Sequence, residues 1–319
     1  MNIRHTKLVF PLIVLLGLTM ILSSTALGKI RNKIEKSFAA SSGGMLSLET
    51  DRGDVDISIG NNSQIEVSIQ LEANTNDEDK AEDIFDDFHV EFAEDGNELI
   101  IDAEYDGKRG SWLFWSKDNR RLRVKFFIKI PEKFDVSVIT SGGDVFVDQL
   151  DGKANVHTSG GDITLENMSG SVRVKTSGGD ISLAGCSGMA DVKTSGGDIN
   201  IGSVEGEVVA VTSGGDIIVD EVMGTIDART SGGDVTARIT TQPNDDCRLT
   251  TSGGNITVYL DPDLGFDLNA KTSGGRVRNS FKVKFDGRVS KRSINAEIND
   301  GGPELYLRTS GGDVRLKEI

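Results

Sequence analysis

The chain has 319 residues, a formal net charge of −15, 38 glycines and 6% aromatic residues. This much glycine excludes a helical bundle, and the lack of a Gly-X-Y period excludes collagen, so repetitive β structure is favoured. The strong acidity argues against nucleic acid as a partner, because domains that bind it carry basic surfaces.

Residues 1–28 are predicted to be an export signal. Arg4 and Lys7 precede an apolar run over residues 8–22, and Ala26-Leu27-Gly28 supplies small residues for cleavage. The alternative is an uncleaved membrane anchor, because residues 8–27 are about long enough to span a bilayer. Either reading places the rest of the chain outside the cytoplasm, as a periplasmic, cell-surface or membrane-anchored domain.

Residues 29–135 are predicted to form an irregular, β-rich N-terminal cap region. Residues 41–49 and 50–58 each carry glycine at the fourth place and apolar residues at the sixth and eighth, which is typical of a degenerate first coil. Three further segments alternate apolar and polar residues and are predicted to be half-buried strands. They are residues 64–71, 98–103 and 123–130.

The cap region is also predicted to contain one short helix, at about residues 76–88. Thr75 and Glu78 have the spacing of a capping box. Apolar residues then follow on one helical face, which should cover a sheet end and protect it from edge-to-edge pairing. They are Ala81, Ile84, Phe85 and Phe88.

One candidate contact site lies within residues 105–121. Both tryptophans of the chain fall there, and cations flank them in an otherwise acidic sequence. Aromatic side chains beside cations suit a membrane interface, an acidic envelope polymer or a protein hot spot. The alternative is that the aromatic run packs over the N-terminal sheet as a plug. The predicted contact residues are Arg109, Trp112, Leu113, Phe114, Trp115, Arg120 and Arg121.

The remaining chain is built from one repeated unit. Thr-Ser-Gly-Gly begins at residue 140 and recurs every 18 residues up to residue 230, with looser copies at 251, 272 and 309. Glycines also recur every nine residues from Gly143 to Gly233, so each unit divides into two nonapeptides. Residues 136–319 are therefore predicted to form an all-β, two-sided parallel β-solenoid of 18-residue coils.

Each predicted coil buries a small set of side chains. Ile163 and Leu165 on one strand, and Val172 and Val174 on the other, alternate inward, and Met168 adds a fifth apolar group at the corner. So small a core cannot stand alone, so stability must come from stacking. The glycines are expected to supply positive φ angles at the turns.

Two rival folds were tested against this pattern. A three-sided helix of hexapeptides is excluded, because the residues six and twelve after Ile163 are Ser169 and Lys175. An antiparallel meander of hairpins remains the alternative. Residues 242–248 and 279–303 interrupt the repeat and should form loops or an extra hairpin. Lys317 and Glu318 are expected to discourage further stacking at the terminal strand.

Aspartates follow the turns in a column: Asp144, Asp162, Asp180, Asp198, Asp216 and Asp234. Calcium-binding nonapeptide repeats place carboxylates in both halves of a coil, whereas this column is one-sided and makes an incomplete cage. We expect these carboxylates to accept turn amide hydrogens, next to outward cations such as Lys175, Lys193 and Arg229. No metal or cofactor is expected.

The cysteines and one tripeptide are interpreted as having no functional role. Cys186 occupies a repeat position filled elsewhere by Leu150, Met168, Val204 and Val222, so it is expected to pack rather than to pair with Cys247. Arg52-Gly53-Asp54 spells a cell-attachment tripeptide, but it coincides with the turn of the degenerate first coil and is attributed to chance.

The tandem Thr-Ser-Gly-Gly-Asp turns, the irregular N-terminal β region and the closing Gly-Gly-Pro-x-Leu at residues 301–305 resemble the bacterial Toastrack family of adhesin-like proteins, over about residues 38–319. The resemblance implies an exported β-solenoid, which in some members accompanies membrane proteins of envelope-stress signalling. It supplies no catalytic residues.

The sequence therefore predicts an exported, non-enzymatic binding or sensor module whose partner is an envelope or membrane protein, a surface polymer or the membrane. The alternatives are a purely structural stalk and a carbohydrate-active enzyme on a β-helix. The enzyme reading is disfavoured because only three histidines are available and the carboxylates are scattered. These histidines are His5, His89 and His157.

Overall fold

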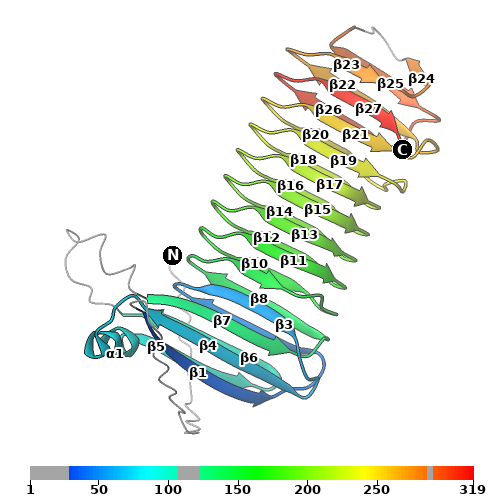
Figure 1. The fold of residues 1–319 in the computed structure, drawn as a ribbon. Helices are drawn as coiled ribbons and strands as arrows, with labels where there is room; N and C mark the ends of the chain where they lie inside the picture. The colour runs from blue at the N-terminus through cyan, green and yellow to red at the C-terminus, as the bar shows by residue number, and fades with distance from the viewer. Residues whose placement is uncertain (1–28, 107–121, 286–289) are drawn as a thin grey trace, which may run out of the picture.

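The computed structural model describes residues 29–106, 122–285 and 290–319. They form an elongated stack in which the chain winds between two long β-sheets, with the cap region at one end and the C-terminal hairpin at the other (Figure 1). One helix, α1 (Glu78–Asp86), lies beside the cap strands. The predicted all-β, two-sided solenoid is confirmed.

The first sheet has 13 strands among the described residues. In spatial order they are β1 (Ile30–Ala39), β4 (Gln64–Ala73), β7 (Leu122–Ile130), β3 (Asp54–Ile59), β9 (Val145–Val147), β11 (Ile163–Met168), β13 (Ile181–Cys186), β15 (Ile199–Val204), β17 (Ile217–Val222), β19 (Val235–Ile239), β21 (Ile256–Leu260), β27 (Val314–Glu318) and β23 (Val277–Asn279).

The second sheet has 14 strands in the same part of the chain. From the cap upward they are β5 (Phe88–Asp95), β6 (Glu98–Tyr105), β2 (Gly44–Thr50), β8 (Phe134–Thr140), β10 (Ala154–His157), β12 (Val172–Lys175), β14 (Ala190–Lys193), β16 (Val208–Val211), β18 (Ile226–Arg229), β20 (Cys247–Thr250), β26 (Glu304–Thr309), β22 (Phe266–Thr272), β25 (Ser293–Ile298) and β24 (Val283–Phe285).

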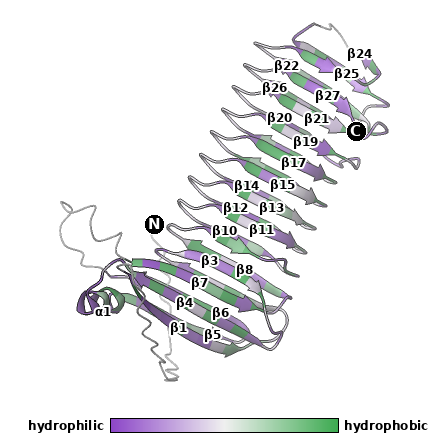
Figure 2. Cartoon of the chain, in the orientation of Figure 1, coloured by the Kyte–Doolittle hydropathy of each residue, from purple (hydrophilic) through white to green (hydrophobic). Residues whose placement is uncertain are grey.

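The strands form because apolar and polar residues alternate along them, as the mixed colours in Figure 2 show. Ile163 and Leu165 of β11 are each 1% exposed, and Thr164 between them is accessible. Val172 and Val174 of β12 face them from the other sheet and are buried as well. A continuous apolar core therefore runs between the sheets, with a few side chains from each coil.

Neighbouring coils stack in parallel with a register of 18 residues through the regular part of the solenoid. Ile163 pairs with Ile181, and Ile181 with Ile199, while Val172 pairs with Ala190 on the opposite sheet. Equivalent side chains thus lie directly above one another. The parallel pairing excludes the antiparallel meander, and the two-sheet cross-section excludes a three-sided helix.

The repeat glycines are needed for a reason different from the predicted one. Gly161, Gly179 and Gly197 do not have positive φ angles; among the second glycines of the turns, only Gly53 and Gly143 do. Instead, a Cβ on Gly161 would overlap the carbonyl oxygen of Gly143 in the coil below. Glycine is therefore required because the backbones of successive turns approach too closely for a side chain.

The cap region contains the predicted strands and two that the prediction missed, β1 and β5. β4 pairs antiparallel with β7 and with β1, while β5 pairs antiparallel with β6. The degenerate first coil, β2 and β3, lies between β6–β7 on one side and β8–β9 on the other. The first coil in the chain is thus an inner layer of the stack.

Helix α1 is shorter than predicted, and its predicted capping box is wrong. The N-cap is Asp77, whose carboxylate accepts the backbone N–H of Lys80 at 3.3 Å, while Thr75 accepts the N–H of Asp77. Phe88 belongs to β5 rather than to the helix. The buried helix face contacts β1 and β4 of one sheet and β5 of the other, so it covers the cap end of both sheets.

The C-terminal coil also departs from the prediction. β26 and β27 are inserted between the β20–β21 coil and the strands β22 and β23, which precede them in the chain. Lys317 and Glu318 therefore do not lie on a terminal strand. The insertion over residues 279–303 supplies β24 and β25, and β25 pairs antiparallel with β22, so the predicted extra hairpin forms the end of this sheet.

An adjacent pair of substitutions tests the small core. We expect Ile181→Asp to abolish folding, because Ile181 is 0% exposed and a carboxylate there would have no partner. Ser182→Asp should leave the fold intact, because Ser182 is on the outer face of the same strand. Circular dichroism and size-exclusion chromatography of both variants check this. Equal behaviour of the two variants would contradict the assigned orientation of β13.

Candidate functional site

The turn that opens each repeat is stabilised by two ladders of side-chain hydrogen bonds. The buried Thr176 hydroxyl donates to the carbonyl of Gly161 in the coil below at 3.0 Å, and Thr194 donates likewise to Gly179. Sequence reasoning assigned no role to this threonine. The close fit of a buried hydroxyl and a backbone carbonyl explains the threonine that opens each turn from Thr158 onward. Thr50 and Thr140 instead donate within their own turns, to the carbonyls of Arg52 and Gly142.

The aspartate column forms the second ladder. The carboxylate of Asp162 accepts the backbone N–H of Asp180 at 2.8 Å, and Asp180 accepts that of Asp198. The predicted structural role is confirmed, although the amide comes from the next coil rather than from the same turn. The neighbouring cations pair within their own strand, Lys193 with Asp191 at 2.7 Å and Arg229 with Asp227.

No group of three or more His, Cys, Asp or Glu side chains is arranged to hold a metal ion within residues 29–106, 122–285 and 290–319. We expect the thermal unfolding midpoint in millimolar Ca²⁺ to equal that in chelator, because the Asp column already binds backbone amides. Differential scanning calorimetry of the purified chain measures both. A midpoint higher by about 10 °C in Ca²⁺ would reveal a specific site, since ligands stabilise the state they bind.

Both cysteines are buried and free, in agreement with the predicted packing role. Cys186 lies in register between Met168 and Val204. Burial raises the pKa of the Cys186 and Cys247 thiols to about 11. Neither thiol therefore has the reactivity that a catalytic nucleophile needs.

The predicted contact residues Arg109, Trp112, Leu113, Phe114, Trp115, Arg120 and Arg121 lie outside the described residues, as does the predicted export signal. Within the part of the chain that the structure describes, no helix has the length and apolarity needed to cross a membrane.

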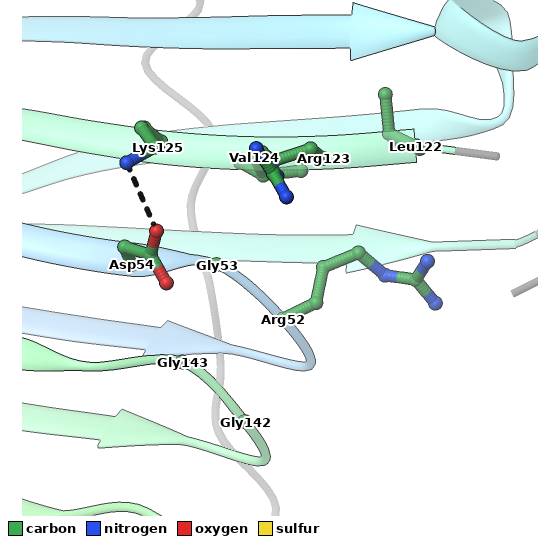
Figure 3. A pocket seen from close by; sticks show the side chains of 9 residues that line it. All are labelled: Arg52, Gly53, Asp54, Leu122, Arg123, Val124, Lys125, Gly142 and Gly143. Carbon is green, nitrogen blue, oxygen red and sulfur yellow. Dashed lines mark ion pairs between the residues drawn. The ribbon is translucent and has the colours of Figure 1, made fainter. Parts of the chain in front are cut away.

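The described residues that follow the predicted contact segment line a hollow, which we call the corner hollow. It has a volume of about 640 Å³ and lies where the turn before β3, the turn before β9 and the start of β7 come together (Figure 3). Its side walls are Arg52 and Asp54 on one side and Leu122, Arg123 and Lys125 on the other, and the glycines of both turns form its floor.

The charges of the corner hollow are largely basic. Lys125 lies 3.1 Å from the Asp54 carboxylate, and the Arg52 guanidinium stacks 4.3 Å from the ring centroid of Tyr105. Arg123 is exposed. The residue opposite it on β4 is Glu72, but Glu72 pairs with Lys29 at 2.7 Å and with Arg31 at 3.1 Å.

Lys29 keeps the Glu72 carboxylate charged. Its side-chain hydrogen bond is the largest influence on Glu72 and lowers the pKa of this carboxyl below its ordinary value. Glu72 is thus held charged and already paired at neutral pH, and the exposed guanidinium of Arg123 remains available to a ligand.

A shallow groove of about 370 Å³ continues from the corner hollow onto the outer face of the first sheet. The two depressions share Asp54 and Lys125. Phe127 and Phe146 line the groove, and Phe127 is 37% exposed. The groove is also lined by Asp56, Asp144 and Asp162, so the excess of basic charge is confined to the corner hollow. The partly exposed aromatic rings adjoin this basic hollow, and arginine and aromatic residues are enriched at binding interfaces.

The corner hollow and the groove combine charged and aromatic side chains. Four carboxylates line the two depressions, and Asp54 is the one that pairs with Lys125. The other three, in the groove, are Asp56, Asp144 and Asp162. Arg52-Gly53-Asp54 is held at the predicted turn, with Gly53 at φ +120° and both charged side chains in contacts of their own. The attribution of this tripeptide to chance is unaffected.

Sequence reasoning missed Arg123, Lys125 and Phe127 as candidate site residues. They alternate with the buried residues of β7 and read as the ordinary outer face of a strand. Only the parallel pairing of β7 with β3 brings them beside the turn at Gly53. No signal in the sequence specifies that pairing.

Two parallel sheets joined at close-packed glycine turns define the protein as a β-solenoid. The family model described as Toastrack DUF4097 matches residues 44–317, and the chain belongs to this family. A search of the curated proteins found no match.

Solved structures with similarity to this chain carry names of binding proteins. A "putative adhesin" from Bacteroides fragilis NCTC 9343 is 12% identical over 90% of this chain and 97% of that one, with a TM-score of 0.40. A "putative cell adhesion protein" from Clostridium sporogenes is 13% identical over 90% and 100%, with a TM-score of 0.21. A "putative lipid binding protein" from Parabacteroides distasonis is 14% identical over 89% and 96%, with a TM-score of 0.30.

Proposed function

We propose that the chain is an exported, non-enzymatic binding module of the bacterial cell envelope, and that it contacts its partner through the corner hollow and the adjoining groove. The observation that supports this most directly is the joined surface of Arg123, Lys125 and Phe127 on a chain of net charge −15. A basic hollow beside partly exposed aromatic rings, on an acidic protein, favours a partner with anionic and apolar groups.

The rest of the fold serves this proposal as a rigid support. The turns are closed by hydrogen bonds between coils, and each strand of the repeats pairs on both sides. A module of this kind presents a site on a stiff body and changes little on binding. Adhesion to a surface and sensing for envelope-stress signalling are two forms that the same binding role can take.

The proposal is tested with isolated envelope fractions and a matched pair of variants. Arg123→Gln with Phe127→Ser removes a cation and an exposed ring from the proposed surface. Lys175→Gln with Ile218→Ser removes the same kinds of group elsewhere, since Lys175 of β12 is exposed and Ile218 of β17 is 40% exposed. We expect the first variant to lose binding in a pull-down and the second to retain it.

Two outcomes would overturn the proposal. If the unaltered chain binds no envelope fraction, a purely structural stalk becomes the better reading. If both variants bind as well as the unaltered chain, the partner uses another surface.

The predicted contact residues remain part of the proposal, and tryptophan fluorescence tests them. Trp112 and Trp115 are the only tryptophans in the chain, so the emission reports on that segment alone. We expect red-shifted emission that iodide quenches in the free protein, followed by a blue shift when envelope fractions are added. Blue, iodide-resistant emission in the free protein would assign the segment to the core instead.

A further inference from the structure

The opposite end of the solenoid carries a second basic surface, which the proposed function does not use. Residues 271–293 contain seven lysines and arginines among the residues that the structure describes and no acidic residue there. These cations are Lys271, Arg276, Arg278, Lys282, Lys284, Lys291 and Arg292. The chain as a whole has a net charge of −15, so such a cluster is a marked local departure.

The column of residues that follows the glycine turns changes from acidic or amide side chains to a basic one in the last layer of the first sheet. Asp234 accepts the backbone N–H of Asn255, Asn255 that of Asp313, and Asp313 that of Arg276 at 2.9 Å. The ladder of acidic or amide side chains therefore ends at Arg276, which occupies the same corner position in the last coil. Among the described residues, β23 is the last strand of the first sheet, so no further turn of this sheet requires a carboxylate at the position.

Two neighbouring columns also carry cations in their last parallel-paired strands. Arg278 of β23 pairs in register with Arg315 of β27, and Lys271 of β22 pairs with Arg308 of β26. These two layers thus present stacked basic residues in both sheets, whereas the middle of the solenoid has one such pair, Lys175 and Lys193, in the second sheet. Stacked like charges repel each other, and an anionic ligand would relieve this repulsion.

The backbone holds Lys291 and Arg292 next to this corner. The carbonyl of Lys291 accepts the N–H of Val277 at 3.0 Å, and the carbonyl of Arg292 accepts that of Thr272 at 2.9 Å. A hollow of about 460 Å³ lies between the two segments and includes Arg276 and Arg278 in its walls. We call this surface the basic end, defined by Arg276, Arg278, Lys291 and Arg292.

One carboxylate, Asp313, also lines the hollow, and it is already engaged. Its Oδ2 lies 2.8 Å from Arg315 and 3.8 Å from Arg278, while its Oδ1 accepts the Arg276 amide. That amide hydrogen bond is the largest influence that lowers the pKa of Asp313. Within the described part of the chain, no carboxylate lies within ion-pair distance of the side chains of Arg276, Lys291 or Arg292.

We propose that the basic end binds an extended polymer that carries repeated anionic groups, with Arg276, Lys291 and Arg292 as the main contacts. Successive cation-bearing strands are about 4.8 Å apart, which lets several groups along one chain bind at once. Phosphate and carboxylate groups both fit guanidinium donors. This site goes beyond the corner hollow and does not depend on it.

Two observations favour a polymer over a lipid surface. The exposed large hydrophobic side chains of the described residues are elsewhere, at Ile59, Phe127, Ile139, Ile218 and Ile319, so the hollow offers cations without an apolar group to insert. At about 4.8 Å per strand, the 13-stranded sheet also places the basic end about 60 Å from β1. A chain held at its N-terminus would present this end away from the anchoring surface.

The test measures binding of fluorescently labelled polyphosphate and poly-glutamate to the chain without residues 1–28, with vesicles of phosphatidylglycerol and phosphatidylcholine as a separate arm. The test variant is Arg276→Gln/Lys291→Gln/Arg292→Gln, which leaves Arg278 beside Asp313. The matched control is Lys133→Gln/Lys153→Gln/Lys175→Gln, which removes three exposed cations elsewhere and changes the net charge equally.

At low salt, we expect the test variant to bind one or both polymers about tenfold more weakly or worse. The slope of log Kd against log salt concentration should also be shallower by about 2, because three contacts that release counterions are lost. The control should stay within about twofold of the unaltered chain. The corner-hollow variant should bind polymer normally, so failure of one site is distinguishable from failure of the other.

Four results would overturn the inference. The first is that the chain binds no polymer at low salt, and the second is that both triple variants bind polymer equally weakly. The third is that vesicles bind more strongly than polymer and need the same three residues. The fourth is that the chain associates with itself at low salt and the test variant does not. The third would identify a membrane as the occupant, and the fourth a second, acidic copy of this chain.

Discussion

Replacing Gly161 by alanine should destabilise the solenoid by about 3 kcal/mol or more, whereas replacing its neighbour Gly160 should change stability by less than about 0.5 kcal/mol. A Cβ at Gly161 would overlap the carbonyl oxygen and carbon of Gly143, which are backbone atoms and cannot rotate away. A Cβ at Gly160 would meet nothing within 4 Å. Either the two coils separate, with the loss of the hydrogen bond from Thr158 to the Gly143 carbonyl, or the turn rearranges.

The measurement is urea unfolding followed by circular dichroism, with both variants in the same background. The pair is well matched because the two glycines are adjacent and neither has a positive φ angle. Loss of backbone freedom in the unfolded chain is also the same for both and cancels. Similar stabilities for the two variants would contradict the close approach of the turns.

The second large effect is expected from truncation at the C-terminus. Deleting residues 303–319 should lower stability more than deleting residues 261–319. Removing residues 303–319 deletes β26 and β27 from inside the stack. It leaves β20 and β21 unpaired on one side of the gap, and β22 and β23 unpaired on the other. Exposed strand edges of this kind invite aggregation.

The gap also removes core contacts. Four apolar side chains that are at most 1% exposed leave with the two strands, at about 1.5–3 kcal/mol each before the entropy of the chain is counted. They are Leu305, Leu307, Val314 and Leu316. The hydrogen bonds from Thr309 to Gly254 and from Thr272 to Gly312, both 2.7 Å, are lost as well.

Removing residues 261–319 instead ends the chain after β21 and leaves a single complete coil, β20–β21, as the last layer. We therefore expect the chain of residues 29–260 to have a higher unfolding midpoint than the chain of residues 29–302. Limited proteolysis with mass spectrometry should also show rapid cleavage within residues 261–302 in the longer chain. A protected 261–302 segment, with an unfolding midpoint at or above that of the shorter chain, would contradict the inserted position of β26 and β27.

The glycine turns could be predicted from the sequence, whereas the inserted position of β26 and β27 could not. The 18-residue period, the inward positions such as Ile163 and the turn column at Asp162 were all read from the sequence, because they repeat at short range. Each follows from strand alternation and from the need to stack equivalent coils. The helix was predicted with the wrong cap because two candidate N-caps, Thr75 and Asp77, lie two residues apart and only the side-chain geometry distinguishes them.

The candidate surfaces were less predictable from the sequence. Residues of β7 such as Arg123 and Phe127 have the pattern of any outer strand face, and they form a site only because β7 lies beside β3. The basic residues near Arg276 were not identified as a site from the sequence. Their position at the open end of the stack could not be read from it, because the chain itself continues for a further repeat.

The sequence by itself determined that this protein is a stack of two-strand coils with a buried apolar column and glycine turns, since every repeat carries those instructions within 18 residues. Only the tertiary structure decided the order of the coils at both ends, where β2–β3 and β26–β27 became inner layers. The physical reason is that each coil offers the same parallel edge and the same threonine and aspartate ladders to a neighbour. The repeats cannot specify which coil lies beside which, so the order of the coils is determined by the antiparallel strands and the connections at each end.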